Sequence, residues 1–506
     1  MPAKTQSKPL LSEGQYIVDQ VNELNFFDLS GQKAKTQGTS NKMYHAELQI
    51  SKNGDKAQIY TMYGPTGSVQ KREWRHYVEI SVAKKDYEVI LKSKRKKGYK
   101  DVDVAQRSLG SDDAKAITKA VVLKNTDGID RSKVKQSTLN DGQKRLVEIF
   151  FGSQAQFVAT TLKCPLGQLS NQQIDDGRAC LDKAKTIINT HKTLTKTHKD
   201  QLMEITNDFY GLIPHNLGAG SRGQMTHLLL DDLTKIMGKE DDLDTLLDAK
   251  AVGAQLKGND SLDAQYKALN SDIQLLDHSD PRFTFLSDYF SNTKVNGHGY
   301  GKARVKNIWE ISRKDGEMKN FLTNTESIAK KCGKHTFASE ASRLSNGKSK
   351  NWVPSKRPDL GKEEVELFNK ANVWLCWHGT RSANLAGITT RGLLVRPSGA
   401  VHTGSMYGDG KYFAWQSTKS LNYTDGGYWT GGRTSSKGRF MFLMDVAMGN
   451  MHIAPRSHFY RSPPAGSHSV YGKASRSGVW NDEMITYDFN KKDTQSQIRY
   501  LFEIVD

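Results

Sequence analysis

Cysteine is scarce in this sequence, and its spacing excludes two classes of structural site. The chain has four cysteines in 506 residues, at Cys164, Cys180, Cys332 and Cys376. None of them stands in a C-x-x-C pair, so we expect no structural zinc site. Four cysteines so widely spread do not make the disulfide framework of a small secreted domain, and they favour a reducing compartment.

Long apolar runs and a targeting segment are also lacking. No stretch approaches the roughly 18 consecutive apolar residues of a membrane-spanning helix. The N-terminal MPAKTQSKPLLSEGQ has no apolar signal-peptide core. We therefore expect a soluble intracellular protein with no membrane partner.

Acidic residues are outnumbered by basic ones. Lys and Arg total 73 against 55 Asp and Glu, which gives a formal net charge of +18. Such an excess favours an anionic partner, most often nucleic acid, although a merely solvated basic surface fits the charge equally well. The length of 506 residues suggests about three domains, and 36% hydrophobic with 25% charged residues is typical of globular protein.

The first part of the chain changes from a polar stretch to short strand-like runs. Residues 1–40 are polar and are expected to form a flexible N-terminal arm. Over residues 41–110, alternating and aromatic-rich runs are separated by Asn53-Gly54-Asp55 and Pro65-Thr66-Gly67, which predicts a small antiparallel sheet. A polar linker is expected over residues 111–136.

A basic run follows these strands. Eight Lys or Arg and two acidic residues lie between Lys84 and Lys100, and a helix is predicted over residues 84–93. Phosphate contacts, a nuclear-import signal and a solvated turn all remain open for this run. The candidate DNA-contacting residues are Lys94, Arg95, Lys96 and Lys97.

Residues 137–258 carry helical patterning. Apolar residues recur with the helical period, for example at Ile174 and Leu181, after the capping box Ser170–Gln173. These stripes predict an all-α bundle without chemistry of its own. A literal G-x-G-x-x-G at 218–223 has no strand before it, and we interpret it as a loop between helices rather than a dinucleotide site.

Residues 268–506 combine strand-like runs with loops rich in Gly and Ser. The predicted strands are VKNIWEIS, NVWLCWH, GKYFAW, GRFMFLMDVAMG, SGVWNDEMITYD and IRYLFEIV. No regular βαβ series indicates a parallel doubly wound sheet. We therefore expect a multi-domain α+β protein.

The most informative stretch covers residues 374–423. An apolar strand ends at His378, and Gly379 and Thr380 follow at once, so a backbone and a hydroxyl are expected to be exposed beside the imidazole. A glycine-punctuated segment then leads to a second predicted strand at 411–413. HGT, TGSMYGDGKYFA and STKSLNY stand in this order within the stretch.

These three elements resemble the catalytic core of the poly(ADP-ribose) polymerase family. They match its His-Gly-Ser/Thr, T-G-x-M-(F/Y)-G-x-G-x-Y-F-A and S-x-K-S-x-N-Y segments. NDEMITYD resembles the family's strand with the catalytic glutamate, at Glu483. The resemblance implies a mixed antiparallel ADP-ribosyltransferase domain, no metal, and His378, Tyr412 and Glu483 as catalytic residues. It implies that NAD+, as substrate, is bound by His378, Gly379, Thr380, Tyr412, Ser420 and Tyr423.

A single carboxylate is chemically sufficient for such a reaction. Nicotinamide in NAD+ is a cationic leaving group that departs neutral, so its glycosidic bond breaks without the general acid that ordinary glycosides need. Glu483 would stabilise the oxocarbenium-like sugar and polarise an incoming hydroxyl. Taken alone, a glutamate at a strand end is more often simply exposed, and only its neighbours favour this role.

The resemblance also assigns roles to the other residues of the pocket. His378 would bond a ribose hydroxyl, and the Gly379 backbone and Ser420 hydroxyl would hold the carboxamide. Tyr423 would stack on the nicotinamide, with Tyr412 on its other side, since an electron-rich ring face suits a cationic pyridinium. Aromatic residues in strands are otherwise more often part of a core.

The earlier parts of the chain resemble two further domains of the family. PLGQLSNQQI and NDFYGLIPH are similar to its helical regulatory domain, which in the family covers the NAD+ entrance until DNA binding loosens it. Leu243, Asp244 and Asp248 match its helix nearest that entrance, though one bundle-facing Leu and two solvated acids explain them equally well. Residues 41–110 resemble its DNA-sensing WGR domain, with Tyr63-Gly64-Pro65 in place of Trp-Gly-Arg. Proline cannot replace a phosphate-binding guanidinium.

Three hypotheses follow from the resemblance. The first is an ADP-ribosyltransferase that DNA breaks activate and that builds poly(ADP-ribose) on itself and other proteins, in the nucleus of a eukaryote or otherwise in the cytoplasm. The second is mono-ADP-ribosylation or NAD+ hydrolysis on the same fold, and the third is an inactive DNA-binding scaffold. The loops 392–403 and 473–481 are short and leave the choice of acceptor open.

Overall fold

The chain folds into two compact units. One comprises residues 1–126 and 155–253, and the other residues 127–154 and 254–506. Among the described helices, none is long and apolar enough to cross a membrane. The computed structural model describes residues 2–12, 14–30, 39–65, 71–102, 137–161, 169–191, 193–215, 225–256, 261–295, 298–332, 354–394, 406–408, 410–425, 427, 438–474, 477–488 and 494–505.

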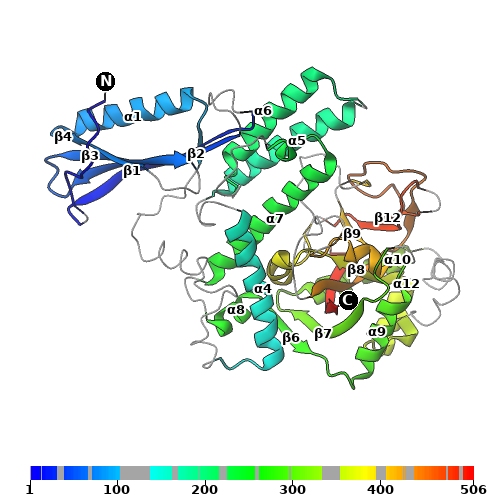
Figure 1. Cartoon of the computed structure of the whole chain (residues 1–506). Coiled ribbons are helices and arrows are strands. Elements are labelled where there is room, and N and C mark those ends of the chain that lie inside the picture. The colour runs from blue at the N-terminus through cyan, green and yellow to red at the C-terminus, as the bar shows by residue number, and fades with distance from the viewer. Residues whose placement is uncertain are drawn as a thin grey trace. The chain divides into compact units, whose positions relative to one another are not determined.

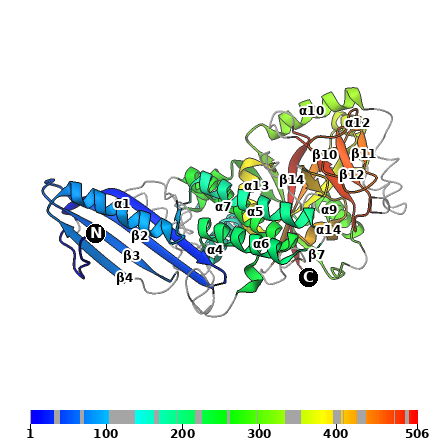
Figure 2. The ribbon, with the colours of Figure 1, turned by 90° about the horizontal axis from the view of Figure 1, so that it is seen from above.

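A five-stranded antiparallel sheet opens the first unit. Helix α1 (Ile80–Lys96) lies across one face of it (Figures 1 and 2) and buries Tyr87 and Leu91 against Leu48 and Ile59. The spatial order β4-β3-β2-β1-β5 contains β1 (Tyr16–Asp28), β2 (Ser40–Ser51), β3 (Ala57–Pro65), β4 (Lys71–Tyr77) and β5 (Lys100–Val102).

The flexible arm predicted over residues 1–40 is wrong for strand β1. This strand pairs with β2 along its whole length, from Tyr16 opposite Ser51 to Asp28 opposite Ser40. The polar composition of this segment led to the wrong prediction. Leu24 and Phe26 become buried only through contacts with β2, β5 and α1, which the local sequence does not reveal. Burial against these partners, which covers every residue from Leu24 to Asp28, stabilises β1 as a strand more than local propensity does.

A helical bundle forms the rest of the first unit. The Ser170 hydroxyl caps α5 by accepting from the Gln173 N–H at 3.1 Å, as predicted, while the Gln173 side chain donates to the Leu212 carbonyl at 2.5 Å. Ile174 and Leu181 are fully buried, which confirms the helical stripe. The helices are the part of α4 (Asp141–Thr161) after residue 154, α5 (Asn171–Thr190), α6 (Lys196–Leu212), the 3-10 turn η2 (Thr226–Leu228) and α7 (Leu233–Leu256).

Two ion pairs connect α5 to α7. Lys185 pairs with Glu240, and both side chains are almost completely buried. Arg178 pairs with Asp244, so this carboxylate is not the solvated acid that the residues alone suggest, whereas Leu243 is buried in the bundle core as expected. The register of α5 against α7 is therefore fixed by charge as well as by packing.

The N-terminal sheet and the bundle share one core. Phe27, Leu29 and Val102 of the sheet side belong to the same apolar cluster as the bundle helices. The Asn25 amide donates to the Tyr210 carbonyl at 3.0 Å, near the C-terminus of α6. This end of the sheet therefore packs as part of the bundle.

The second unit is built on two sheets. The five-stranded sheet has the order β6-β7-β14-β10-β8 and is antiparallel, and the four-stranded sheet has the order β11-β12-β13-β9 with β11 and β12 parallel. Each of the six predicted runs contains a strand, although only Glu483–Thr486 of SGVWNDEMITYD and only Lys411–Phe413 of GKYFAW form one. The strands are β6 (Ser271–Leu275), β7 (Arg304–Arg313), β8 (Val373–Gly379), β9 (Lys411–Phe413), β10 (Arg439–Ala447), β11 (Met451–Ile453), β12 (Ser469–Gly472), β13 (Glu483–Thr486) and β14 (Ser496–Val505).

Helices cover these two sheets, and the first part of α4 is one of these helices. The division between the units falls within α4, because the Trp309 indole donates to the Gly142 carbonyl at 3.2 Å and Arg145 pairs with Glu503. Residues 137–154 thus group with the second unit rather than with the bundle. The other helices of the second unit are α8 (Leu262–Ala268), α9 (Pro281–Asn292), α10 (Glu317–Lys331), η4 (Pro354–Lys356), α12 (Lys362–Lys370), η5 (Ser382–Asn384), α13 (Leu385–Arg391) and α14 (Ser417–Leu421).

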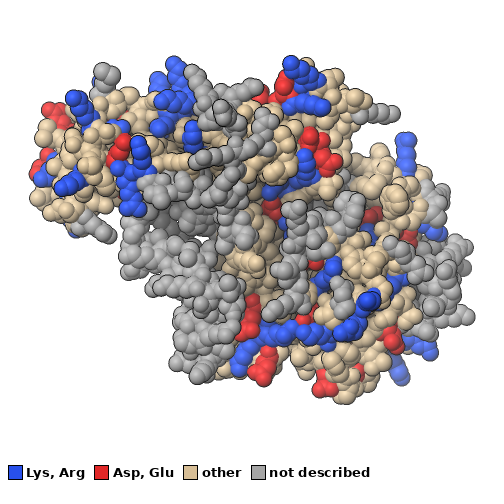
Figure 3. Space-filling model, viewed as in Figure 1, with Lys and Arg blue, Asp and Glu red and all other residues tan. Residues whose placement is uncertain are grey.

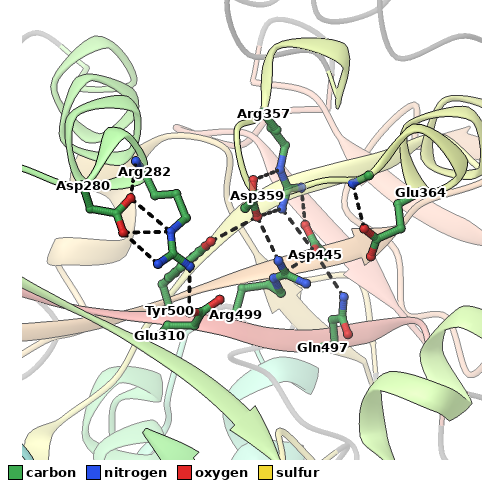
Figure 4. A network of polar contacts seen from close by, with 11 residues as sticks. Asp280, Arg282, Glu310, Arg357, Asp359, Glu364, Asp445, Gln497, Arg499 and Tyr500 are labelled. Atoms are coloured by element: carbon green, nitrogen blue, oxygen red, sulfur yellow. Dashed lines mark hydrogen bonds and ion pairs between the residues drawn. The ribbon is translucent and has the colours of Figure 1, made fainter. Parts of the chain in front are cut away.

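A network of buried charges connects η4 to the five-stranded sheet (Figure 4). Arg357 bonds Asp359 at 2.7 Å and also pairs with Asp445 of β10. Arg499 and Tyr500 of β14 donate to the same Asp359 carboxylate at 2.9 and 3.1 Å. Each buried charge therefore has partners, as burial requires.

The remaining predictions concern the cysteines and three predicted loop or linker segments. Cys180, Cys332 and Cys376 are free thiols in the described part of the chain. The G-x-G-x-x-G at 218–223, the linker at 111–136 and most of the loop 392–403 lie outside the described residues.

Candidate active site

Three strands bring the predicted catalytic residues together. His378 lies near the end of β8, Tyr412 in β9 and Glu483 at the start of β13. Strand β8 joins β9 through a bridge between Trp377 and Ala414, whose backbone groups bond at 2.7 and 3.0 Å, and β9 pairs with β13. The site thus lies where the two sheets of the second unit meet.

His378 is held in one tautomer by the backbone of Tyr412. Its Nδ1 lies 3.1 Å from the Tyr412 carbonyl oxygen, which can only accept, so Nδ1–H donates and Nε2 keeps a lone pair. Burial lowers the pKa of His378, and the positive charge of Lys419 lowers it further. A neutral imidazole with an accepting Nε2 is suited to bond a hydroxyl group.

Tyr412 lies on the same sheet face as Glu483. Tyr412 is directly opposite Ile485 in the antiparallel ladder, and Glu483 is two residues from Ile485, so all three side chains project to one face. The Tyr412 hydroxyl donates to the Gly408 carbonyl at 2.9 Å and accepts from the Tyr407 N–H at 3.0 Å. The ring is therefore fixed by the loop before β9.

Glu483 is a partly buried carboxylate paired with a lysine of α14. Lys419 Nζ binds Glu483 Oε2 and also donates to the Asp482 carbonyl at 3.0 Å. Burial raises the pKa of Glu483, the Lys419 charge opposes this rise, and the Asp482 charge adds to it. The carboxylate is thus a stronger base than an exposed glutamate, with its direction set by Lys419.

Gly379 contacts the backbone of Ser420 so closely that no side chain fits. A Cβ atom on Gly379 would lie 1.8 Å from the Ser420 carbonyl oxygen. Glycine at position 379 therefore lets the end of β8 reach α14, which brings together the two groups expected to hold a carboxamide. Burial raises the pKa of Tyr423, and the charge of Glu483 raises it further, so this phenol lies within electrostatic reach of the carboxylate.

Thr380 differs from the exposed hydroxyl that the sequence predicted. Its side chain is only 7% exposed, and its hydroxyl accepts from the Asn384 amide at 3.0 Å. The turn η5 places Asn384 beside it, so the hydroxyl already has a partner inside the protein.

Sequence reasoning missed two residues next to Glu483. Lys419 stands within STKSLNY and Asp482 within NDEMITYD, so both lie in motifs that the resemblance used. Asp482 adjoins Glu483 in the chain, whereas the contact of Lys419 with Glu483 depends on how α14 packs against β13, and no spacing rule gives that packing. The described part of the chain contains no group of three or more His, Cys, Asp or Glu side chains that could hold a metal ion.

The candidate DNA-contacting residues lie at the C-terminal end of α1. A group of Lys and Arg side chains gathers there (Figure 3). Lys96 and Lys97 are exposed, whereas Arg95 forms a two-bond ion pair with Asp101 at 2.8 and 2.9 Å. Lys94 Nζ lies 3.8 Å from the centre of the Tyr44 ring.

Lys94 differs from the other three basic residues in its surroundings. Burial lowers its pKa to about 8, and Lys97 and Arg75 add to this effect. Part of the basic run therefore has internal partners, and the last turn of a helix also favours positive charge.

Tyr63 and Pro65 stand where the WGR resemblance expects Trp and Arg. Tyr63 stacks on Tyr44 with ring centres 5.7 Å apart and donates to Glu73 at 2.8 Å. Pro65 ends β3 opposite Lys42. The aromatic position is thus filled and ordered, while the guanidinium has no replacement at position 65.

Comparison with known proteins decides the family. Residues 282–500 match the model of the poly(ADP-ribose) polymerase catalytic domain, and residues 145–272 match that of the poly(ADP-ribose) polymerase regulatory domain. The chain belongs to the poly(ADP-ribose) polymerase family. His378, Tyr412 and Glu483 all lie within the matched catalytic domain.

Similar proteins come from several animals. Poly [ADP-ribose] polymerase 1 of Gallus gallus is 27% identical over 367 residues, which are 68% of this chain and 30% of that protein. The protein mono-ADP-ribosyltransferase PARP3 of Mus musculus is 25% identical over 479 residues, which are 88% of this chain and 77% of that protein. Poly [ADP-ribose] polymerase of Drosophila melanogaster is 25% identical over 86% of this chain and 39% of that protein. The chain thus spans about a third of its poly [ADP-ribose] polymerase 1 relatives.

Proposed function

We propose that the protein is an ADP-ribosyltransferase that uses NAD+ as substrate. One observation carries the proposal: His378, Tyr412 and Glu483 lie on three adjoining strands at one sheet junction, inside a poly(ADP-ribose) polymerase catalytic domain. The reaction breaks the bond between nicotinamide and ribose and joins the ribose carbon to an acceptor, and nicotinamide leaves with the electron pair of the broken bond.

Glu483 supplies the negative charge that this reaction needs. Its carboxylate stabilises the positive charge that develops on the sugar as nicotinamide leaves, and preorganised charge of this kind is a major source of catalysis. The same carboxylate accepts a hydrogen bond from the acceptor hydroxyl and so favours its attack. Because the raised pKa of Glu483 keeps it protonated in mild acid, the rate falls as the pH is lowered through that pKa.

The neighbouring groups hold the substrate. Neutral His378 accepts a hydrogen bond from a ribose hydroxyl through Nε2, since Nδ1–H is already bound to Tyr412. The Gly379 backbone and the Ser420 hydroxyl bind the carboxamide, and Tyr423 stacks on the pyridinium ring. The meeting of Gly379 with Ser420 supports this assignment because it brings both carboxamide partners to one place.

Incorporation of labelled NAD+ tests the activity directly. We expect the protein to release nicotinamide and to become labelled itself. The Glu483→Gln variant is expected to lose about 100- to 1,000-fold in polymer formation, because it removes charge stabilisation that acts mainly in the transition state. Its affinity for NAD+, measured by calorimetry, should change little. Polymer formation by Glu483→Gln at the wild-type rate would refute the role of Glu483 in elongation.

Polymer formation is proposed over single transfer. The support is the carboxylate of Glu483, which can activate a ribose hydroxyl of a chain already attached. Mono-ADP-ribosylation is the second candidate, because the PARP3 relatives with that name match most of this chain. A gel of the automodified protein separates the two, since a polymer gives a ladder and a single transfer gives one shifted band. NAD+ hydrolysis alone would release nicotinamide without labelling protein.

DNA breaks are the proposed activator, and other proteins the proposed acceptors besides the enzyme itself. The support is the exposed pair Lys96 and Lys97 at the end of α1, the net charge of +18 and the match to a regulatory domain. Such an enzyme acts in DNA repair and is placed in the nucleus. An inactive scaffold would release no nicotinamide, so the same assay excludes it.

A further inference from the structure

Asp482, the residue before Glu483, is bound at every polar atom it has. Its side chain is 5% exposed. Oδ2 accepts from the Trp415 indole at 2.7 Å and from the Tyr471 hydroxyl at 2.8 Å, and Oδ1 accepts from the Ala474 N–H at 2.9 Å. These donors come from the segment after β9, from β12 and from the segment after β12.

The backbone of Asp482 is held as well. Its N–H donates to the Gln416 side chain at 3.2 Å, and its carbonyl accepts from Lys419 at 3.0 Å. Lys419 also binds the Glu483 carboxylate. The peptide leading into Glu483 is therefore held on both sides, and this fixes the start of β13.

We propose that Asp482 is a positioning residue for Glu483, which it aims at the reacting sugar through its bonds to Trp415, Tyr471 and Ala474. The inference rests on the catalytic role proposed for Glu483. The donors to Asp482 are all neutral, so its carboxylate adds a second negative charge beside the active one. A buried carboxylate with three donors also fixes its segment more firmly than a neutral side chain can.

The charge of Asp482 has a second consequence. It raises the pKa of Glu483, in addition to the effect of burial and against the effect of Lys419. Removing that charge while leaving Lys419 in place therefore lowers the pKa of Glu483. The acidic limb of the rate profile should then move to lower pH.

Asp482→Asn is the decisive variant because an amide cannot satisfy the site. In the wild-type protein each carboxylate oxygen of Asp482 accepts from a protein donor. In the asparagine variant one of these two oxygens is replaced by an NH2 group. An N–H therefore meets an N–H in either orientation. We expect kcat to fall about 10- to 100-fold, as for a small displacement of a catalytic group. The KM for NAD+ should stay close to the wild-type value, and the acidic limb should move to lower pH.

Two further variants separate positioning from a general loss of stability. Tyr471→Phe removes one donor and keeps the charge, so it should lower kcat less and should not move the limb to lower pH. Asp359→Asn removes another buried carboxylate, one that belongs to the network in Figure 4. It should lower the melting temperature without moving the limb.

Each result decides the proposal. The proposal is overturned if Asp482→Asn keeps the wild-type kcat and the wild-type acidic limb of the pH–rate profile. It is also overturned if Asp482→Asn loses rate while the acidic limb stays in place, as expected for Asp359→Asn. If the wild-type chain turns over no NAD+, the proposed function fails. A titration of the 13C-labelled Glu483 carboxyl, assigned with Glu483→Gln, then still tests Asp482, because it needs no turnover. The midpoint should be lower in Asp482→Asn, and an equal midpoint overturns the inference.

Discussion

At the residue scale, Lys419 stabilises the charged form of Glu483 and holds its carboxylate in one direction. It is 6% exposed, and its single ammonium group binds the carboxylate and the carbonyl before it. Because its charge opposes the effect of burial on Glu483, Lys419 and Asp482 act on the pKa of this group in opposite directions. The two residues together adjust the base strength of one carboxylate.

The Lys419→Met variant tests this balance. Without the ammonium group the pKa of Glu483 rises further, so the acidic limb of kcat/KM should move to higher pH, opposite to Asp482→Asn. We expect the rate at neutral pH to fall at least about tenfold, since a hydrogen bond to a charged group contributes about 1.5–3 kcal/mol. Steady-state kinetics between pH 5 and 9 measures both effects.

Lys411 provides the matched control for Lys419. It is also a buried lysine, on β9, and it pairs with Asp488 just after β13 at 2.5 Å. Lys411→Met should lower the melting temperature but leave the limb in place. If both lysine variants move the limb alike, the effect is not specific to Lys419.

At the element scale, the pairing of α5 with α7 depends on a buried charge pair. Lys185 of α5 and Glu240 of α7 are almost completely buried between these helices, which the partly buried pair Arg178 and Asp244 also joins. Removing one member of a buried ion pair takes the counter-charge from the other and costs about 3–5 kcal/mol, whereas replacing both by apolar groups can be neutral. This makes the contact sensitive to single substitutions.

We expect Glu240→Gln to reduce amide-exchange protection in α5 and α7. The double variant Lys185→Met with Glu240→Leu should restore it, because no buried charge is left unpaired. Lys235 of α7 forms a more exposed pair with Asp231, which lies just before that helix, and Asp231→Asn should cost less than about 1 kcal/mol. Equal losses of protection in Glu240→Gln and Asp231→Asn would contradict this account.

At the scale of the whole molecule, the charge of +18 and the basic end of α1 favour an anionic activator. We expect broken duplex DNA to raise the rate of nicotinamide release, most strongly at low salt, because phosphate contacts weaken as salt rises. Replacing Lys96 and Lys97 by Gln should raise the DNA concentration needed for half activation and make its salt dependence shallower. DNA ends that leave the rate unchanged at low salt would refute DNA activation.

A charge-matched control lies at the turn between β2 and β3. Lys52 is exposed there and Lys56 is half-buried, and their replacement by Gln removes the same two charges from the same domain. This variant should be activated like the wild type. If it behaves like the Lys96 and Lys97 variant, general charge explains the effect and no particular contact does.

The sequence by itself determined the family, the order of the catalytic elements and six of the nine strands that the structure describes in the second unit, since β6, β11 and β12 were not predicted. HGT, TGSMYGDGKYFA, STKSLNY and NDEMITYD are local patterns, so they specify residue type and local backbone without knowledge of distant contacts. Strands β8, β10 and β14 were predictable for the same reason, because most of their own residues are apolar.

Only the tertiary structure decided which residues surround these patterns. Strand β1 is polar enough to resemble a flexible arm, and it becomes a strand through partners on β2 and β5. Lys419 and Asp482 stand 63 positions apart and meet because α14 packs against the start of β13. Thr380 loses its exposure when η5 folds beside it. Long-range contacts of this kind have no fixed spacing in the chain, so a local pattern cannot specify them.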